Sequence, residues 1–223
     1  FGPGAGIGDS HSGMGGGHAG FGGSSYFTYA GGSTYGSAVA PVLAGSGSGR
    51  YGNMGGIPGG GCVRLAARRV LVNGTLTAQG GKGTGPGGAG GAVFITCGAL
   101  SGTNGVIRVS GGDSAHTWSG GGGGGRIAVS VDPDAQAAAG VPSLVFDAAP
   151  GVSGVELKST YPQRQADLGT LWFSDAPAFV RSPLTAAVTG QLCGPADWAC
   201  DTLIVSNTWI RFAQEGGVAR VTN

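Results

Sequence analysis

Charged side chains are scarce in this sequence: they make up 10% of its 223 residues, and the formal net charge is +1. Proteins that bind nucleic acids or anionic membrane surfaces carry clusters of Lys and Arg, because those cations neutralise phosphate groups. The sequence also lacks an apolar run near the roughly 20 residues that a membrane-spanning helix needs. We therefore expect neither nucleic acid as a partner nor insertion into a membrane.

Helix-forming signals are scarce as well. The one long alanine run, DAQAAAGVP, is cut short by Gly140 and Pro142, which both end helices. Glycine is abundant instead, with 51 residues, yet 40% of the chain is hydrophobic and the glycines do not hold every third position. These features argue against disorder and against collagen.

Strand signals recur along the chain in units of two short strands. Segments 62–81, 92–112 and 126–149 can be aligned with one another, and apolar residues alternate within each strand. The period is about 30 to 34 residues, and stacked units can bury a face that one strand pair cannot. The sequence therefore predicts an all-β fold, a parallel β-helix or solenoid with stacked Gly-rich loops. The aligned positions are Val63, Val93 and Ile127 in the first strand, and Leu76, Ile107 and Leu144 in the second.

Composition divides the chain into three segments. Residues 1–60 are a Gly-rich lead-in that we expect to pack on the solenoid, residues 61–149 hold the Gly-rich repeats, and residues 150–223 continue the β array with fewer glycines. In this last segment, 169–183 aligns loosely with 201–215. Because no signal peptide is recognisable at the start, we expect a mature chain or a piece of a longer one. Because no polar capping unit is recognisable at the end, we predict a fragment of a larger chain, or a module that stacks on something else.

The glycine clusters keep phase with the strands. Residues 80–91 follow the second strand of one unit, and residues 111–125 follow that of the next. Ordering glycine costs about 1 to 2 kcal/mol per residue in backbone entropy, but closely packed, hydrogen-bonded backbones can offset that cost. Since flexible linkers have no reason to recur in phase, we predict ordered, stacked loops in extended polyglycine-like layers.

Motifs typical of phosphate binding and of catalysis fail on their context. GPGGAG (85–90) has the letters of a dinucleotide fingerprint but leads into a strand, and Lys82 lacks the spacing of a Walker loop. Asp113, Ser114 and His116 are the residue types of a nucleophilic triad, yet a triad is assembled in space and not along one loop. We interpret them as polar residues of a glycine loop, and expect no cofactor and no enzyme.

Acidic and histidine side chains suggest little further chemistry. Asp132 and Asp134 form a close pair that could flank a glycosidic bond or bind calcium, although an Asp-Pro turn is the favoured interpretation. His11 and His18 are interpreted as loop polarity in preference to metal ligands. A polysaccharide lyase or hydrolase is the least favoured alternative, and it requires four acids to gather on one face: Asp113, Asp132, Asp134 and Glu156.

The sequence has 4 cysteines and one glycosylation sequon. Cys193 and Cys200 close a short polar loop, CGPADWAC, which is typical of a disulfide in an oxidising compartment. Alignment of the units separates Cys62 and Cys97 by about 16 Å, at ~3.3 Å per residue, which is too far for a disulfide. Asn73 begins the sequon Asn-Gly-Thr and is a candidate N-glycosylation site, although Asn-Gly is also a preferred tight turn.

In order along the chain, GHAGFGG (17–23), YGS (35–37), GSGSG (45–49) and the glycine-flanked strands up to residue 131 resemble a known module. It is the glycine-rich module of very large extracellular and cell-surface repeat proteins of bacteria, algae and protists. Among eukaryotic examples, the chain resembles filament-forming proteins of flagellar hairs, the mastigonemes. The resemblance implies a structural or adhesive role without an established catalytic set. The cysteines are a departure that fits extracellular eukaryotic use.

Together these features favour a structural module of an extracellular or cell-surface filament or assembly. It would act by stacking of its units and by lateral packing, with copies of itself or other segments of the assembly as partners. The alternative is a carbohydrate-binding or adhesion module that takes polysaccharide on aromatic surfaces such as Trp118 and Trp198.

Overall fold

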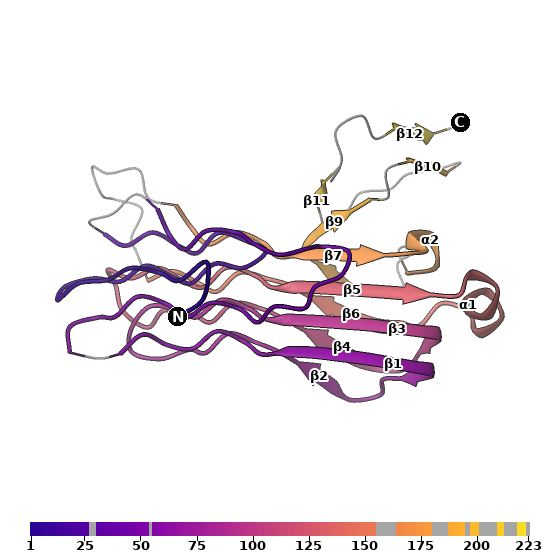
Figure 1. Ribbon diagram of the computed structural model, residues 1–223, viewed down its shortest axis with the longest axis horizontal. Helices are drawn as coiled ribbons and strands as arrows, with labels where there is room; N and C mark the ends of the chain where they lie inside the picture. Colours follow the sequence, from indigo (N-terminus) through magenta and orange to yellow (C-terminus); the bar gives the residue numbers. More distant parts are fainter. Residues whose placement is uncertain are drawn as a thin grey trace.

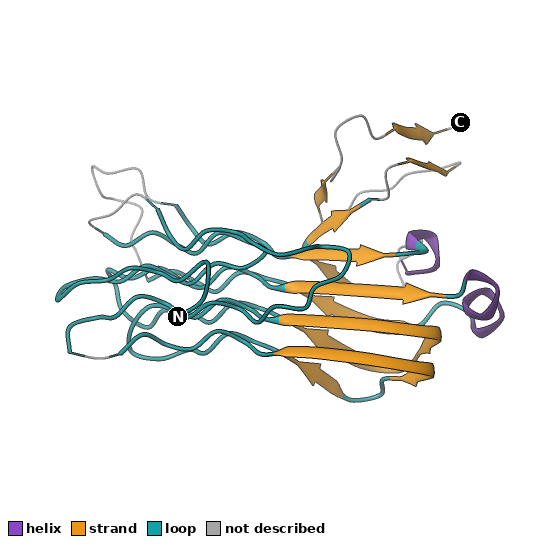
Figure 2. Cartoon of the chain, viewed as in Figure 1, coloured by secondary structure: helices purple, strands orange, loops and turns teal. Residues whose placement is uncertain are grey.

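The computed structural model describes residues 1–26, 30–53, 55–154, 164–179, 187–194, 197–200, 209–211 and 218–221. The strands and two short helices lie toward one end of the molecule, and long segments without strands extend from them toward the other (Figures 1 and 2). The elements are β1 (Cys62–Leu71), β2 (Thr75–Thr77), β3 (Ala92–Ser101), β4 (Thr103–Arg108), β5 (Arg126–Val131), α1 (Pro133–Ala139), β6 (Ser143–Asp147), β7 (Thr170–Phe173), α2 (Ala176–Phe179), β8 (Ala187–Thr189), β9 (Gln191–Cys193), β10 (Asp197–Cys200), β11 (Trp209–Arg211) and β12 (Val218–Val221).

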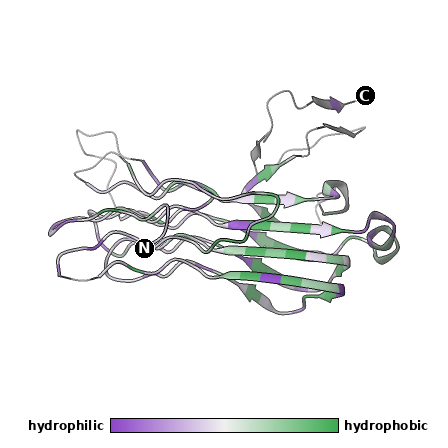
Figure 3. Cartoon of the chain, in the orientation of Figure 1, coloured by the Kyte–Doolittle hydropathy of each residue, from purple (hydrophilic) through white to green (hydrophobic). Residues whose placement is uncertain are grey.

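Successive strands alternate between two parallel sheets. One sheet is 6-stranded, in the order β1-β3-β5-β7-β9-β11, the other is 4-stranded, in the order β2-β4-β6-β8, and β10 pairs with β12 alone. Apolar residues gather on the strands, where they alternate with polar ones (Figure 3). Val93, Ile127 and Leu171 of the first sheet and Ile107 and Phe146 of the second are fully buried in one core.

The predicted register of the first strands is confirmed: Val63 pairs with Val93, and Val93 pairs with Ile127. In the second strands, the predicted pairing of Leu76 with Ile107 is also confirmed. Beyond this point the alignment slips, because Ile107 pairs with Phe146 and not with Leu144. A slip of two residues leaves the same face of a strand inward, so alternation alone could not detect it. 

The predicted alignment of 169–183 with 201–215 places Leu203 against Leu171, and it is wrong there, because Leu171 pairs with Ile127 of β5 and with Leu192 of β9. Leu203 itself lies outside the described residues. Glycine is scarcer in this part of the chain, and the intervals between strands therefore lose the regular spacing on which the prediction rested.

The predicted fold class, an all-β parallel β-helix, is wrong. The described chain forms two parallel sheets with the short helices α1 and α2, an α/β type of arrangement, and its units do not close into a solenoid. The glycine-rich segments leave the strands and run beside one another as a separate bundle (Figure 2). Because these segments satisfy their N–H and C=O groups with each other, they do not supply the strands that would close a coil. Neither described helix has the length and apolar character of a membrane span.

The prediction that the glycine loops are ordered and stacked is confirmed. Backbone hydrogen bonds join segments far apart in sequence: Gly90 N donates to Gly123 O at 2.8 Å, and Gly123 N donates to Gly16 O at 2.9 Å. In the same way, Gly87 N donates to the Gly120 carbonyl and Gly112 N donates to the Gly88 carbonyl. The bundle is therefore a network of main-chain bonds in which the lead-in takes part.

Close backbone contact explains why glycine is required in this bundle. A Cβ atom on Gly123 would overlap the carbonyl oxygen of Gly20, and one on Gly90 would overlap that of Val109. In both cases the obstacle is main chain, which cannot rotate away as a side chain can. 

We expect Gly123→Ala to lower the free energy of unfolding by more than about 3 kcal/mol, because the methyl group must displace a neighbouring backbone. Gly61→Ala is the matched control, since a Cβ there meets nothing within 4 Å; it should change stability by less than about 1 kcal/mol. Urea unfolding followed by circular dichroism measures both. Equal stability of the two variants would restore the flexible-linker interpretation.

Candidate functional site

Four rings from three separate segments of the glycine bundle meet in one place. The His116 and Tyr51 ring centroids are 3.9 Å apart, those of His116 and Trp118 are 5.8 Å apart, and those of Tyr26 and Trp118 are 5.9 Å apart. We call Tyr26, Tyr51, His116 and Trp118 the aromatic cluster. Trp118 is 43% exposed, and the other three side chains are half-buried.

A tight turn holds the His116 ring in this cluster. The Ser114 hydroxyl donates to the His116 carbonyl at 3.1 Å and accepts from the His116 N–H at 3.2 Å. The Trp118 N–H donates to His116 Nδ1, so the neutral imidazole carries its proton on Nε2. The turn is anchored to the next glycine segment, because Ser114 N donates to the Val152 carbonyl. 

The triad candidates have structural partners in the same turn. Asp113 Oδ1 accepts from Val152 N at 2.9 Å, and the hydrogen bonds of the Ser114 hydroxyl go to the main chain of His116 and not to its ring. This arrangement does not form the nucleophile-to-base hydrogen bond of a triad. 

The structure separates the candidate acids. Asp132 is the N-cap of α1 and accepts from Ala135 N, and Asp134 lies in the first turn of that helix, whereas Asp113 belongs to the glycine bundle. The alanine run thus forms a short helix where a turn was expected, since Asp132 and Pro133 supply a favourable start. Glu156 lies outside the described residues. Over the part of the chain that the structure describes, no group of three or more His, Cys, Asp or Glu side chains could hold a metal ion.

His18 is a buried polar residue of the glycine-rich lead-in, whereas His11 is exposed. His18 Nδ1 donates to the Gly90 carbonyl at 2.9 Å, and its ring lies against that of Tyr35 at 4.8 Å between centroids. Buried Arg126 donates to the Tyr35 carbonyl through Nη2 at 2.6 Å and to Thr170 Oγ1 through Nη1 at 3.0 Å. Arg126 thereby ties the lead-in to the first sheet, and His18 ties it to the glycine bundle.

Burial lowers the pKa of His18 to about 4, and the nearby Arg126 guanidinium adds to this effect. The bond to the Gly90 carbonyl opposes the shift but does not cancel it. His18 Nε2 is buried and pairs with no other described group. The neutral imidazole is therefore the form that fits the fold.

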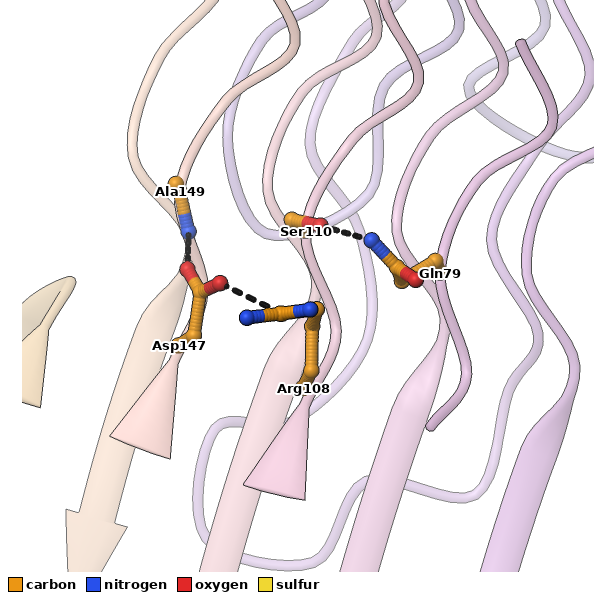
Figure 4. A network of polar contacts seen from close by, with 5 residues as sticks. All are labelled: Gln79, Arg108, Ser110, Asp147 and Ala149. Carbon is orange, nitrogen blue, oxygen red and sulfur yellow. Dashed lines mark hydrogen bonds and ion pairs between the residues drawn. The ribbon is translucent and has the colours of Figure 1, made fainter. Parts of the chain in front are cut away.

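A polar network lies where the strands of the second sheet pass into the glycine bundle (Figure 4). Arg108 Nε donates to Asp147 Oδ2 at 2.8 Å, and the other oxygen of Asp147 accepts from Ala149 N. Gln79 donates to the Ser110 hydroxyl at 2.8 Å. The Arg108 side chain is 39% exposed, and an exposed ion pair adds little to the free energy of unfolding. We therefore infer that this pair mainly aligns the neighbouring units.

The remaining predicted residues are placed as follows. Asn73 is exposed between β1 and β2, and its Oδ1 accepts from Thr103 N at 2.9 Å. Cys62 is exposed and Cys97 is buried, and burial raises the pKa of the Cys97 thiol. Cys193 is buried on β9, but the side chain of Cys200 lies outside the described residues, so their disulfide stays a prediction.

Sequence reasoning missed Tyr26, Tyr51 and Arg126. Tyr51 stands alone among small residues in RYGNMGG, and Tyr26 begins the short aromatic run YFTY; rings within glycine-rich sequence were the available signal. Arg126 was predicted to begin a strand whose side chains alternate between the inner and the outer face of the sheet. Nothing in the sequence indicates that the lead-in covers the Arg126 side chain. 

No family model matches the chain, and no curated protein or solved structure is significantly similar to it. 

We expect the protein to lose stability as the pH falls from about 6.5 to about 4. The pKa of His18 is depressed from 6.5 to about 4, so across this window the unfolded chain binds a proton that the folded chain does not. The loss attributable to His18 should be roughly 3 kcal/mol. 

Urea unfolding at a series of pH values measures this loss. His18→Asn is the comparison, because subtracting its pH profile removes the contribution of the carboxylates. Identical slopes for the wild type and the variant would contradict the assignment.

Proposed function

We propose that this chain is a structural module of an extracellular filament or surface assembly, and that it acts by stacking of its units and by lateral packing. Its partners are copies of itself or other segments of the same assembly. The observation that carries this proposal is the open edge formed by β1 and β2, supported by the ordered glycine bundle beside it.

The strands β1 and β2 each stand at an end of their sheet. Val63 and Leu65 of β1 are only half-buried, whereas their neighbours Val93 and Ile95 on β3 are 0% exposed. A further strand placed against β1 would bury the half-exposed residues and pair the free main-chain groups of that edge. The edge therefore fits a stacking contact.

The glycine bundle is open at the same edge. Gly59 and Gly60 pack against segments of the next layer, but a Cβ on Gly55 or Gly61 would meet nothing within 4 Å. Residues 55–59 are exposed or half-buried. Strands and glycine segments thus present one continuous surface to an incoming unit.

The charges on β1 give this edge selectivity. Arg64, Arg68 and Arg69 are all exposed on the strand, and the Arg64 guanidinium lies over the Phe94 ring at 5.6 Å. Charged side chains on an edge strand discourage indiscriminate pairing between molecules. They favour a partner strand that places acidic or hydrogen-bonding groups opposite them.

Proline at position 66 tests the edge. Gly61 O accepts from Ala92 N, and because main-chain groups alternate in direction, Ala66 directs its N–H away from β3. Ala66→Pro removes this outward donor and should abolish concentration-dependent self-association in sedimentation velocity, while Ala66→Val should retain it. Electron microscopy of the wild type should show short filaments. Dispersed monomers at every concentration would count against the proposal.

An extracellular location predicts two modifications that can be measured together. Chain secreted from a eukaryotic host should carry a glycan on Asn73, and peptides containing Cys193 and Cys200 should be joined until reduced. Mass spectrometry with and without glycosidase and reductant checks both. Asn73→Gln and Cys200→Ser are the matched controls, and unmodified peptides from secreted wild type would contradict the location.

A further inference from the structure

The aromatic cluster contains no residue of the open edge formed by β1, β2 and residues 55–61, and it calls for an explanation of its own. Aromatic residues are only 8% of the chain, yet rings from three separate segments meet where the surrounding loops consist mainly of glycine. Trp118 remains 43% exposed there. Large rings that are grouped and partly exposed mark a binding surface more often than a core.

Two polar side chains on the loop that carries the Trp118 ring have an atom left for a ligand: Asp113 is exposed and His116 is half-buried. Among the described residues, no group pairs with His116 Nε2 or with Asp113 Oδ2, although the other nitrogen and the other oxygen of these side chains are bonded within the loop. His116 Nε2 is not one of the buried unpartnered atoms, so water reaches it. The cluster therefore offers aromatic faces and one N–H donor, and the exposed carboxylate of Asp113 stands three residues before His116 on the same loop.

We propose that the aromatic cluster binds a neutral polysaccharide and that it contacts one sugar ring of the polymer. A pyranose has an apolar C–H face that packs on an aromatic ring, and hydroxyl groups at its edge that both donate and accept hydrogen bonds. Trp118 supplies the exposed face, His116 Nε2 donates to a hydroxyl, and Asp113 Oδ2 accepts from another. The Tyr51 ring, tilted by 36° against the His116 ring with 3.9 Å between centroids, holds the imidazole in place.

Size and charge favour a sugar as the occupant. A stable contact between proteins buries about 800 Å² on each partner, and a group of four rings, three of them half-buried, is too small to supply that. The Arg50 guanidinium, which precedes Tyr51 in the chain, lies near the carboxylate of Asp9, and Asp113 is an exposed acid on the adjoining loop, so the described groups give no excess of positive charge to select an acidic sugar. The inference goes beyond the structural role and does not depend on it.

Calorimetric titration of the full chain with neutral hexasaccharides of glucose, mannose and xylose tests the proposal, with a polyuronate oligomer as the charged comparison. We expect at least one neutral sugar to bind, and Trp118→Ala to weaken its Kd at least tenfold, equal to about 1.4 kcal/mol. Trp118→Tyr should restore most of the affinity. Phe21→Ala is the matched control, because Phe21 is similarly exposed, at 39%, and makes none of the ring contacts of the cluster.

Thermal melting of each variant establishes that it folds. The proposal is overturned if no neutral sugar binds, or if Trp118→Ala binds as the wild type does. It is also overturned if Trp118→Ala reduces self-association in sedimentation and leaves sugar binding unchanged, because the cluster would then be a contact between copies.

Discussion

Close approach of one main chain to another is the constraint on which this structure depends. At Gly123 a single methyl group would overlap the carbonyl of Gly20, and the same exclusion recurs at Gly90 against Val109. Segments that lie this close satisfy their N–H and C=O groups on each other, which offsets the large entropic cost of ordering glycine. The bundle is therefore stabilised by main-chain hydrogen bonds, with little contribution from the apolar burial that stabilises the strands.

The two kinds of packing need each other. The sheets bury an apolar core and thereby fix the spacing at which successive glycine segments leave the strands. That spacing brings the segments within hydrogen-bonding distance, and the Arg108 to Asp147 pair aligns neighbouring units at the transition (Figure 4). Arg126 and His18 then attach the lead-in to both parts. A change that shifts one strand would consequently disturb the glycine bundle as well as the core.

Features with a side-chain pattern could be predicted from the sequence, and contacts between bare backbones could not. Alternation and spacing gave the pairing of Val63 with Val93, but the same pattern tolerates a two-residue slip, and Leu144 was misplaced for that reason. The phase of the glycine clusters indicated order, yet nothing in a run of identical residues says that Gly123 bonds to Gly16. The open course of the bundle, and with it the departure from a closed solenoid, follows from those contacts. The meeting of Tyr51 with His116 had no sequence signal for the same reason.

The close packing of the glycine segments also limits where functional side chains can lie in the molecule. The interior of the bundle has no room for a Cβ at most of its glycines, so functional side chains are confined to the open edge, to the turns and to the rare buried positions such as His18. The turn at residues 113–118 is one place where a carboxylate, an imidazole and an indole occur together. A scaffold built mainly from backbone thus leaves its edges and its turns as the places where side chains can change in sequence. The glycine at each packed position, by contrast, is fixed by contact with a neighbouring chain segment.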